Sequence, residues 1–240
     1  MKISQEKECP LCKGLGWIKD KSGVRKCTCM YTLLTENIFR RMNIPKRYKD
    51  KELSNFIINK GYRHDLIISK VEEYINSDDF TEGKGIFFVG PPGVGKTHLA
   101  VSILKEFFKR RKIVGLFYDT RSLLFDLKAT FDGSSSGREI LEDVVKTPIL
   151  VLDDLGSERL SEWARDILHY IIINRYNELR PVIITSNIEI TKKAENDVRE
   201  TLEERMGTAI ASRLSEMCQI LTVKGQDMRT SKLIQLQYDK

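Results

Sequence analysis

The sequence predicts an α/β fold that is organised around a phosphate-binding loop. Residues 90–97 (GPPGVGKT) match the pattern G-x-x-x-x-G-K-[ST]. The apolar run at 86–89 is typical of a buried parallel strand, and apolar residues recur at helical spacing after the loop. Two further apolar runs, 149–152 and 182–184, end in polar residues. In a doubly wound sheet, ligands bind at these carboxyl ends of the strands.

Composition narrows the class of protein. With 240 residues, 41% apolar and 31% charged, the chain can form one α/β core and a small additional module. It has no apolar run near the ~20 residues of a membrane span and no apolar signal core at its start. We therefore expect a cytoplasmic protein that makes no membrane contact. Five cysteines in this setting favour reduced thiols or metal ligands over disulfides.

Basic residues are concentrated at the beginning of the chain. Residues 1–51 contain 13 Lys and Arg but 5 Asp and Glu, a net charge of +8, whereas the other residues carry a net charge of −2. A solvated basic segment would explain this excess. An acidic partner surface or a nucleic acid would explain it equally well, and the charge alone does not choose between them.

The first module contains two cysteine pairs, Cys9 with Cys12 and Cys27 with Cys29. The residues between the pairs predict a small hairpin with its turn at 20–23, which would bring the pairs together. Four thiolates suit a closed, structural Zn²⁺ site, whose binding energy would fold so small a segment. Because the second pair is C-x-C, a redox pair or an iron–sulfur cluster is the alternative.

The remaining elements follow from local patterns along the chain. Helices are expected at 31–39, at 62–76, at 119–128 and at 138–145, and strands at 114–118 and 219–223. A basic linker at 40–48 leads into the α/β domain. Cys218, just before the last strand, is expected to be a buried, small apolar side chain.

The phosphate loop predicts the position of a nucleoside triphosphate. Its glycines allow the backbone N–H groups to point at the phosphates, and the following helix adds the positive end of its dipole. Lys96 would reach the β- and γ-phosphates, and the Thr97 hydroxyl would ligate Mg²⁺. The predicted nucleotide-binding residues of this segment are Pro91, Pro92, Gly93, Val94, Gly95, Lys96, Thr97 and His98.

Polar side chains at two strand ends predict the catalytic groups. Asp153 would hold Mg²⁺ through water, and Asp154 lies where a general base could polarise the attacking water. Asn187 would orient this water or contact the γ-phosphate. The alternatives are a strand that merely ends in polar residues and an asparagine that only forms a turn.

These motifs together resemble the AAA+ ATPases and, among them, the DnaC/DnaI-type bacterial helicase loaders. The resemblance rests on the cysteine module, on the entry segment 44–48, on the phosphate loop, and on segments 153–156, 185–187 and 211–229. It implies a five-stranded parallel sheet with the phosphate loop after its first strand. It also implies a zinc-binding, helicase-interaction module at 1–42, an AAA+ ATPase domain at 43–240, and no C-terminal helical lid domain.

The resemblance also implies roles for individual residues. Ile44, Pro45 and Tyr48 would lie near the adenine. Asn187 matches sensor I, and Arg229 resembles the arginine of sensor II.

An arginine finger is implied as well. Arg213 would reach the ATP of a neighbouring subunit. Ala209 replaces a second arginine that many loaders have, so Arg205 is the alternative finger. We therefore expect weak hydrolysis by the monomer and assembly into ATP-dependent oligomers.

The function implied is ATP-dependent loading of the hexameric replicative helicase onto single-stranded DNA, with a replication initiator ATPase as a further candidate partner. The helix after the second strand would face DNA through Arg121, Ser122, Lys128, Thr130 and Phe131. The alternative is an ordinary amphipathic helix whose leucines at 123, 124 and 127 pack inward.

Two other functions remain open. An IstB-type transposition helper ATPase would have nearly the same core but would act on duplex DNA and a transposase. The other function is a nucleotide-gated scaffold with little turnover. Hydrolysis would be slow because the Asp154 carboxylate reaches one methylene less than the glutamate usual in AAA+ proteins.

Overall fold

The computed structural model describes residues 9–12, 15, 17–20, 23–27, 37–130, 136–157, 160–192 and 199–229. The chain forms two compact units, residues 1–42 and residues 43–240. Within the described ranges, the helices are too short or too polar to cross a bilayer.

The first unit contains a two-stranded hairpin. Strand β1 (Trp17–Asp20) pairs antiparallel with β2 (Gly23–Lys26), with Asp20 opposite Gly23, which confirms the predicted hairpin and its turn. The side chains of β2 are all exposed, and the buried side chains among the described residues of this unit are Cys12, Cys27 and Met42. A helical turn covers residues 37–41, and residues 31–36 of the predicted helix lie outside the described ranges.

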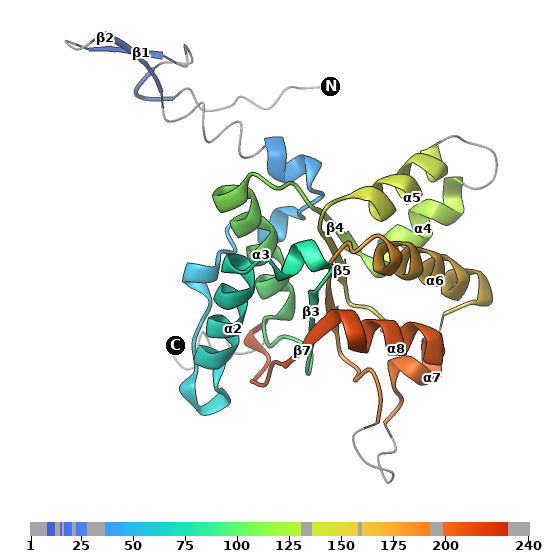
Figure 1. Ribbon diagram of the computed structural model, residues 1–240. Helices are drawn as coiled ribbons and strands as arrows, with labels where there is room; N and C mark the ends of the chain where they lie inside the picture. The colour runs from blue at the N-terminus through green and yellow to red at the C-terminus, as the bar shows by residue number, and fades with distance from the viewer. Residues whose placement is uncertain are drawn as a thin grey trace, which may run out of the picture. The chain divides into compact units, whose positions relative to one another are not determined.

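The second unit is built on a five-stranded parallel sheet, as predicted (Figure 1). The phosphate loop follows the first of these strands, β3. The strand order is β4 (Leu116–Asp119), β5 (Leu150–Asp153), β6 (Val182–Ser186), β3 (Gly85–Val89) and β7 (Cys218–Thr222).

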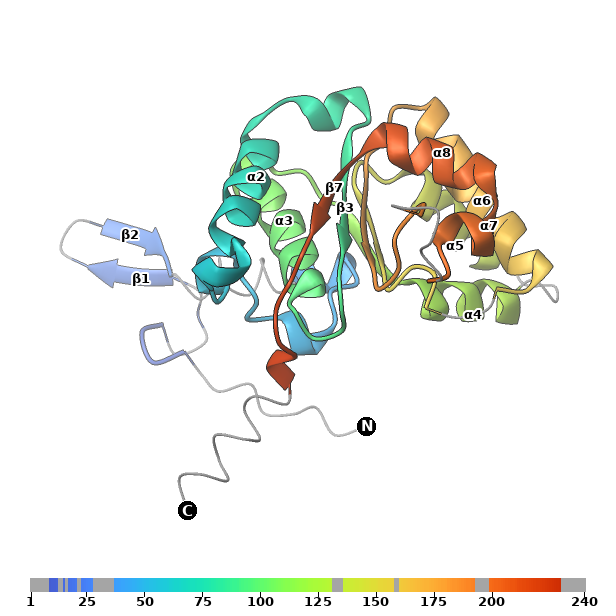
Figure 2. The same cartoon turned by 90° about the horizontal axis from the view of Figure 1, so that it is seen from below.

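Helices cover both faces of this sheet. In Figure 2, α2 (His64–Asn76) and α3 (Lys96–Arg111) lie on one side of the strands, and α6 (Glu162–Asn177) and α8 (Thr208–Met217) lie on the other. Every residue of β3, β5 and β6 is buried as a result. On the α6 side, Phe87, Leu152 and Ile184 pack into one apolar core with residues of α6 and α8.

Three further helices and four short 3₁₀ turns complete the described part of the unit. The helices are α4 (Thr120–Thr130), α5 (Ser136–Lys146) and α7 (Leu202–Met206), and the turns are η1 (Lys46–Tyr48), η2 (Leu53–Asn55), η3 (Lys60–Tyr62) and η4 (Asp79–Glu82). Helices α2, α4 and α5 confirm sequence predictions. Helices α6, α7 and α8 were not predicted from the sequence, and β4 begins two residues later than predicted.

A buried arginine joins the elements around the end of α5. Arg175 of α6 is fully buried, and its guanidinium donates hydrogen bonds to the carbonyls of Val144 (2.8 Å), Thr147 (2.9 Å) and Pro181 (2.7 Å). The first two carbonyls lie at the negative end of α5, where a cation is favoured. Arg175 thereby fixes the chain just before β5 and β6.

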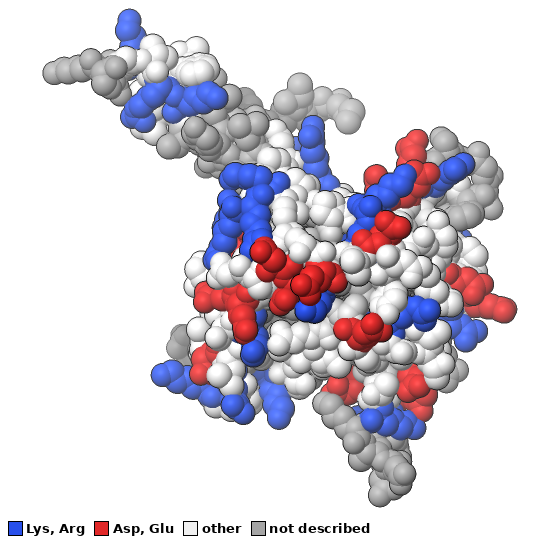
Figure 3. All heavy atoms as spheres, viewed as in Figure 1, with Lys and Arg blue, Asp and Glu red and all other residues white. Residues whose placement is uncertain are grey.

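The two units differ in surface charge. In the view of Figure 3, the described side chains of residues 1–42 include basic groups, and the two signs are interspersed over residues 43–240. Over the full sequence, residues 1–42 contain nine Lys and Arg and four Asp and Glu, a net charge of +5, whereas residues 43–240 carry a net charge of +1.

Candidate functional site

The phosphate loop joins β3 to α3, whose first residue is Lys96. Gly93 and Gly95 have φ angles of 78° and 100°, in the left-handed region that favours glycine. A Cβ atom on Gly95 would also lie 2.7 Å from the Phe56 ring, and one on Gly93 would collide with the Asp227 carboxylate. Both positions therefore require glycine for conformation and for space.

The ammonium group of Lys96 is held inside this loop. Its Nζ donates hydrogen bonds to the carbonyls of Gly90 and Pro91 and to Oδ1 of Asn187, each at 2.8 Å. Burial lowers the pKa of Lys96 to about 8, and the nearby carboxylates of Asp154 and Asp153 oppose this shift. The side chain therefore remains mostly charged at neutral pH.

The ends of β5 and β6 meet beside the loop. The Thr185 hydroxyl donates to Oδ1 of Asp153 at 2.6 Å and accepts the Asp154 N–H at 2.9 Å. Burial raises the pKa of Asp153, and hydrogen bonds from Thr185 and Thr97 counteract this rise. One buried hydroxyl thus positions both consecutive acidic residues. Thr185 had no predicted role, because its proximity to β5 depends on the strand order.

Asn187 connects the loop to the second aspartate. Its Nδ2 donates to Oδ1 of Asp154 at 2.8 Å, while its Oδ1 accepts from Lys96. Asp154 has a φ angle of 57°, an uncommon value for a residue with a side chain. The hydrogen bond from its N–H to Thr185 fixes this conformation. Two consecutive hydrogen bonds therefore connect Lys96, Asn187 and Asp154.

These groups border a cavity of about 460 Å³. The predicted site residues that line it are Tyr48, Pro92, Gly93, Gly95, Lys96, Thr97, His98, Asp153, Asp154, Asn187 and Arg229. The structure adds further lining residues that the sequence analysis did not single out, namely Arg47, Lys51, Asn55, Ile57, Asp119, Thr185 and Met228. Of the predicted residues, Ile44, Pro45, Pro91, Val94 and Arg213 are not among those described along its wall.

The two candidate arginine fingers lie elsewhere on the second unit. Arg213 of α8 is half-buried, donates to the Ala209 carbonyl at 2.9 Å and lies 5.7 Å from the Tyr176 ring centroid. Arg205 of α7 donates to the Gly156 carbonyl and to the Glu200 carboxylate. Neither is among the described residues that line the cavity.

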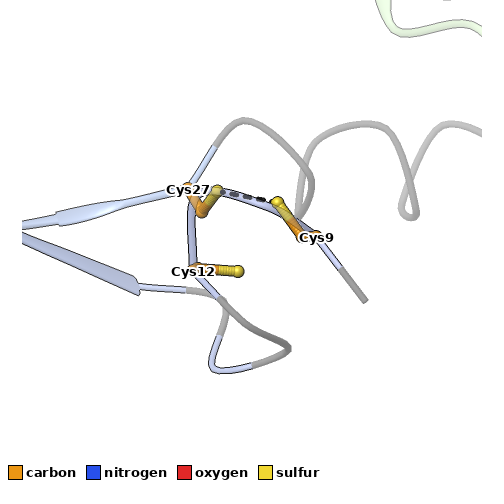
Figure 4. Close-up of side chains that lie close together, drawn as sticks. All are labelled: Cys9, Cys12 and Cys27. Carbon is orange, nitrogen blue, oxygen red and sulfur yellow. Dashed lines mark hydrogen bonds between the residues drawn. The ribbon is translucent and has the colours of Figure 1, made fainter. Parts of the chain in front are cut away.

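The cysteine cluster is a candidate metal centre. The sulfur atoms of Cys9, Cys12 and Cys27 lie within 4.8 Å of one another, and those of Cys9 and Cys27 are 3.7 Å apart (Figure 4). Zn–S bonds of about 2.3 Å in a tetrahedron place the sulfurs about 3.8 Å apart. Hydrogen bonds from the backbone of Cys12 and Leu11 lower the pKa of Cys9 to about 7, which favours the ligating thiolate. These three thiols fit a structural metal site, and Cys29 lies outside the described residues.

Helix α4 has two distinct faces. Leu123 and Leu127 are fully buried, whereas Arg121, Ser122 and Lys128 are exposed. The inward packing and a solvent-facing polar surface therefore coexist on this helix.

The same solvent-facing surface carries Phe125, which is 72% exposed and which the sequence analysis did not select. The sequence offered one signal for this role: Phe125 follows Arg121 by four residues, so the two side chains lie on the same face of a helix. Phe131, the aromatic residue that was selected, lies outside the described residues.

The chain matches the family described as IstB-like ATP binding protein over residues 37–235. The match contains every described residue that borders the cavity and begins after the cysteine cluster.

Individual relatives include helicase loaders. A crystal structure of the DnaC helicase loader is 39% identical, has a TM-score of 0.67, and covers 75% of this chain and 100% of its own. The replicative helicase loader DnaC of Escherichia coli K12 is 28% identical over 73% of each chain. The uncharacterized protein YqaM of Bacillus subtilis is 26% identical over 85% of this chain. The matched part spans 65% of the length of YqaM, slightly less than two thirds. The similarity to DnaC-type loaders confirms the resemblance seen in the sequence motifs.

Proposed function

Because the chain belongs to the family of IstB-like ATP-binding proteins, we propose that it hydrolyses ATP to load a replicative DNA helicase onto single-stranded DNA. The observation that carries this proposal is the 39% identity to a DnaC helicase loader over the full length of that chain. The connected side chains of Lys96, Asn187 and Asp154 agree with it, since they supply the groups that an ATPase site requires.

Each side chain has a task in the proposed reaction. Lys96 and the N–H groups of the loop bind the phosphates, and Thr97 and Asp153 would hold Mg²⁺, which neutralises phosphate charge when bound. Asp154 accepts a hydrogen bond from the attacking water and polarises it. Asn187 orients this water, because its amide is fixed between Lys96 and Asp154.

We propose that Arg213 of a neighbouring subunit completes the site. The arginines that line the cavity are Arg47 and Arg229, and Arg213 of the same chain is not among its lining residues. A guanidinium that arrives with a second subunit would stabilise the charge that develops on the γ-phosphate, an effect of about 10³–10⁵ in rate in other NTPases. Hydrolysis would then depend on assembly into an ATP-dependent oligomer.

The first unit is the proposed docking site for the hexameric helicase. Its cysteine cluster fits a structural Zn²⁺ completed by Cys29, and its exposed strand β2 carries basic side chains that would suit an acidic partner. A replication initiator ATPase is a further proposed partner of the same chain.

The exposed face of α4 is the proposed contact for single-stranded DNA. Arg121 and Lys128 supply charge for the phosphate backbone, and the exposed Phe125 ring offers a surface on which a base can stack. This arrangement would bind DNA with little preference for sequence.

A transposition helper ATPase is the second candidate, and the family match to IstB-like proteins favours it. The test is retention of purified replicative helicase or transposase from the same organism on the immobilised full chain, with ATP or ADP present. The loader proposal predicts ATP-dependent retention of the helicase. Retention of the transposase alone would refute it.

A nucleotide-gated scaffold is distinguished from an enzyme by steady-state hydrolysis. The proposed ATPase turns over ATP at a rate that rises when single-stranded DNA promotes assembly. Tight ATP binding without turnover, at any protein concentration and with or without DNA, would establish the scaffold instead.

A further inference from the structure

A buried lysine in the third turn of α3 has no role in the reaction described above. The Lys105 side chain has an exposed fraction of 0%, and its Nζ donates hydrogen bonds to the carbonyls of Tyr48 (3.0 Å), Lys49 (2.5 Å) and Lys51 (2.8 Å). The nearest carboxylate oxygen, from Glu52, lies at 3.6 Å. A buried ammonium is costly unless polar groups surround it. These four acceptors come from one short segment of the chain.

This segment, residues 46–57, is called the linker strap below. Its Glu52 carbonyl also lies 2.8 Å from Nε2 of His98, and the Glu52 carboxylate pairs with Lys109. Three side chains of α3, spaced along the helix, thus hold the same strap. The strap is fixed to α3 over nearly the whole length of the helix.

The linker strap is also one wall of the nucleotide cavity. Its lining residues are Arg47, Tyr48, Lys51, Asn55 and Ile57. The phosphate loop, which leads directly into α3, borders the same cavity, and the Phe56 ring of the strap lies beside Gly95 of the loop. The same helix therefore carries the phosphate-binding group at its N-terminus and holds the strap that forms this wall through Lys105.

We propose that Lys105 is a positioning residue that sets the base-binding end of the nucleotide cavity. Lys105 does not line the cavity and acts through the strap, which it holds at a fixed distance from the phosphate loop. This distance determines how well a purine base fits beside Tyr48 and Ile57 while its phosphates occupy the loop. The inference rests on the proposed binding of ATP and extends it to the affinity and selection of the base.

The test separates the two ends of the cavity with two ligands. The variants Lys105→Met and Lys105→Gln of the full chain are titrated with a fluorescent ATP analogue, and ATP, GTP and inorganic tripolyphosphate compete for the site. Because Lys105→Met leaves the carbonyls of Tyr48, Lys49 and Lys51 without this donor, the strap should detach, and ATP affinity should fall on the order of tenfold to a hundredfold. Tripolyphosphate affinity should stay unchanged, and the preference for ATP over GTP should shrink.

The matched control is Arg110→Met, which removes an exposed cation from the same helix. Arg110 donates hydrogen bonds to Glu106 and Asn76, which both lie outside the strap. Lys105→Gln keeps a neutral donor and serves as the milder variant if Lys105→Met does not fold.

Three outcomes decide the matter. Selective loss of ATP affinity supports the inference. Wild-type ATP affinity in Lys105→Gln and in any folded Lys105→Met, or equal loss of ATP and tripolyphosphate, overturns it. Failure of the wild-type chain to bind ATP would instead refute the proposed function.

Discussion

The two units of this chain are stabilised in different ways. In residues 1–42, the strand side chains of β2 are exposed, and two of the three described buried side chains are cysteines. In residues 43–240, whole strands are buried between helices. A segment as small as the hairpin buries too little apolar surface to fold alone. The first unit must therefore depend on its thiols, and the second on its apolar core.

Metal removal should have the largest effect, and it should be confined to the first unit. Structural Zn²⁺ contributes about 10–16 kcal/mol in comparable small sites, so a chelator or Cys27→Ser should unfold the hairpin. Hydrogen exchange followed by mass spectrometry would show loss of amide protection at residues 9–27, with protection of the central sheet unchanged. Persistent protection of the hairpin in metal-free protein would contradict this dependence on the thiols.

A substitution that should affect the second unit and leave the first unchanged is Phe87→Ala in β3. Phe87 is fully buried in the core shared with α6 and α8, and its truncation should lower the free energy of unfolding of the second unit by about 3–5 kcal/mol. Denaturant titration measures this change. Bound metal per chain should stay at the wild-type value. The control Ile220→Ala, at a 45% exposed position of β7, should cost much less.

Removal of the Thr185 hydroxyl should have a moderate effect on the site. Thr185→Val leaves Asp153 and Asp154 without a shared partner, and the loss of about 1–3 kcal/mol should slow hydrolysis roughly tenfold to a hundredfold. Thr185→Ser keeps the hydroxyl and should restore most of the rate. Binding of ATP in EDTA should be equal in all three proteins. Equal rates for the Val and Ser variants would show that the hydroxyl is unimportant.

The last prediction concerns which unit holds DNA. Phe125→Ala should weaken binding of single-stranded DNA by about 1–3 kcal/mol, measured by fluorescence anisotropy, and leave ATP binding unchanged. The matched control is Tyr170→Ala, which removes another exposed aromatic ring, on α6. If chelation of the metal abolished DNA binding while Phe125→Ala did not affect it, the basic first unit would be the DNA contact.

Much of the sheet was predictable because its strands are short apolar runs with polar ends. Helix α6 was missed, since apolar residues such as Ile167, Ile171 and Ile173 occur around much of its circumference and blur the helical period. Helix α8 was missed as well. Its alanines and serines weaken the apolar pattern.

In the candidate site, too, some residues were predictable from the sequence and others were not. Lys96, Asp153 and Asn187 follow from local motifs, and the structure brings them together at one cavity. Thr185 and Lys105 could not be predicted, because their partners are distant in the sequence and become neighbours only through the strand order and the packing of the linker strap on α3. Motifs identify the groups that contact a ligand. The side chains that position those groups depend on the tertiary fold.

The central claim is that hydrolysis requires an arginine from an adjoining subunit. The most direct measurement mixes two inactive proteins, Lys96→Ala and Arg213→Ala, and follows ATP turnover at a concentration where the wild-type chain assembles. The account predicts that each variant alone is nearly inactive and that the mixture regains activity, because an intact loop from one chain meets Arg213 from the other. Wild-type turnover by Arg213→Ala alone, or a mixture no more active than its components, would contradict it.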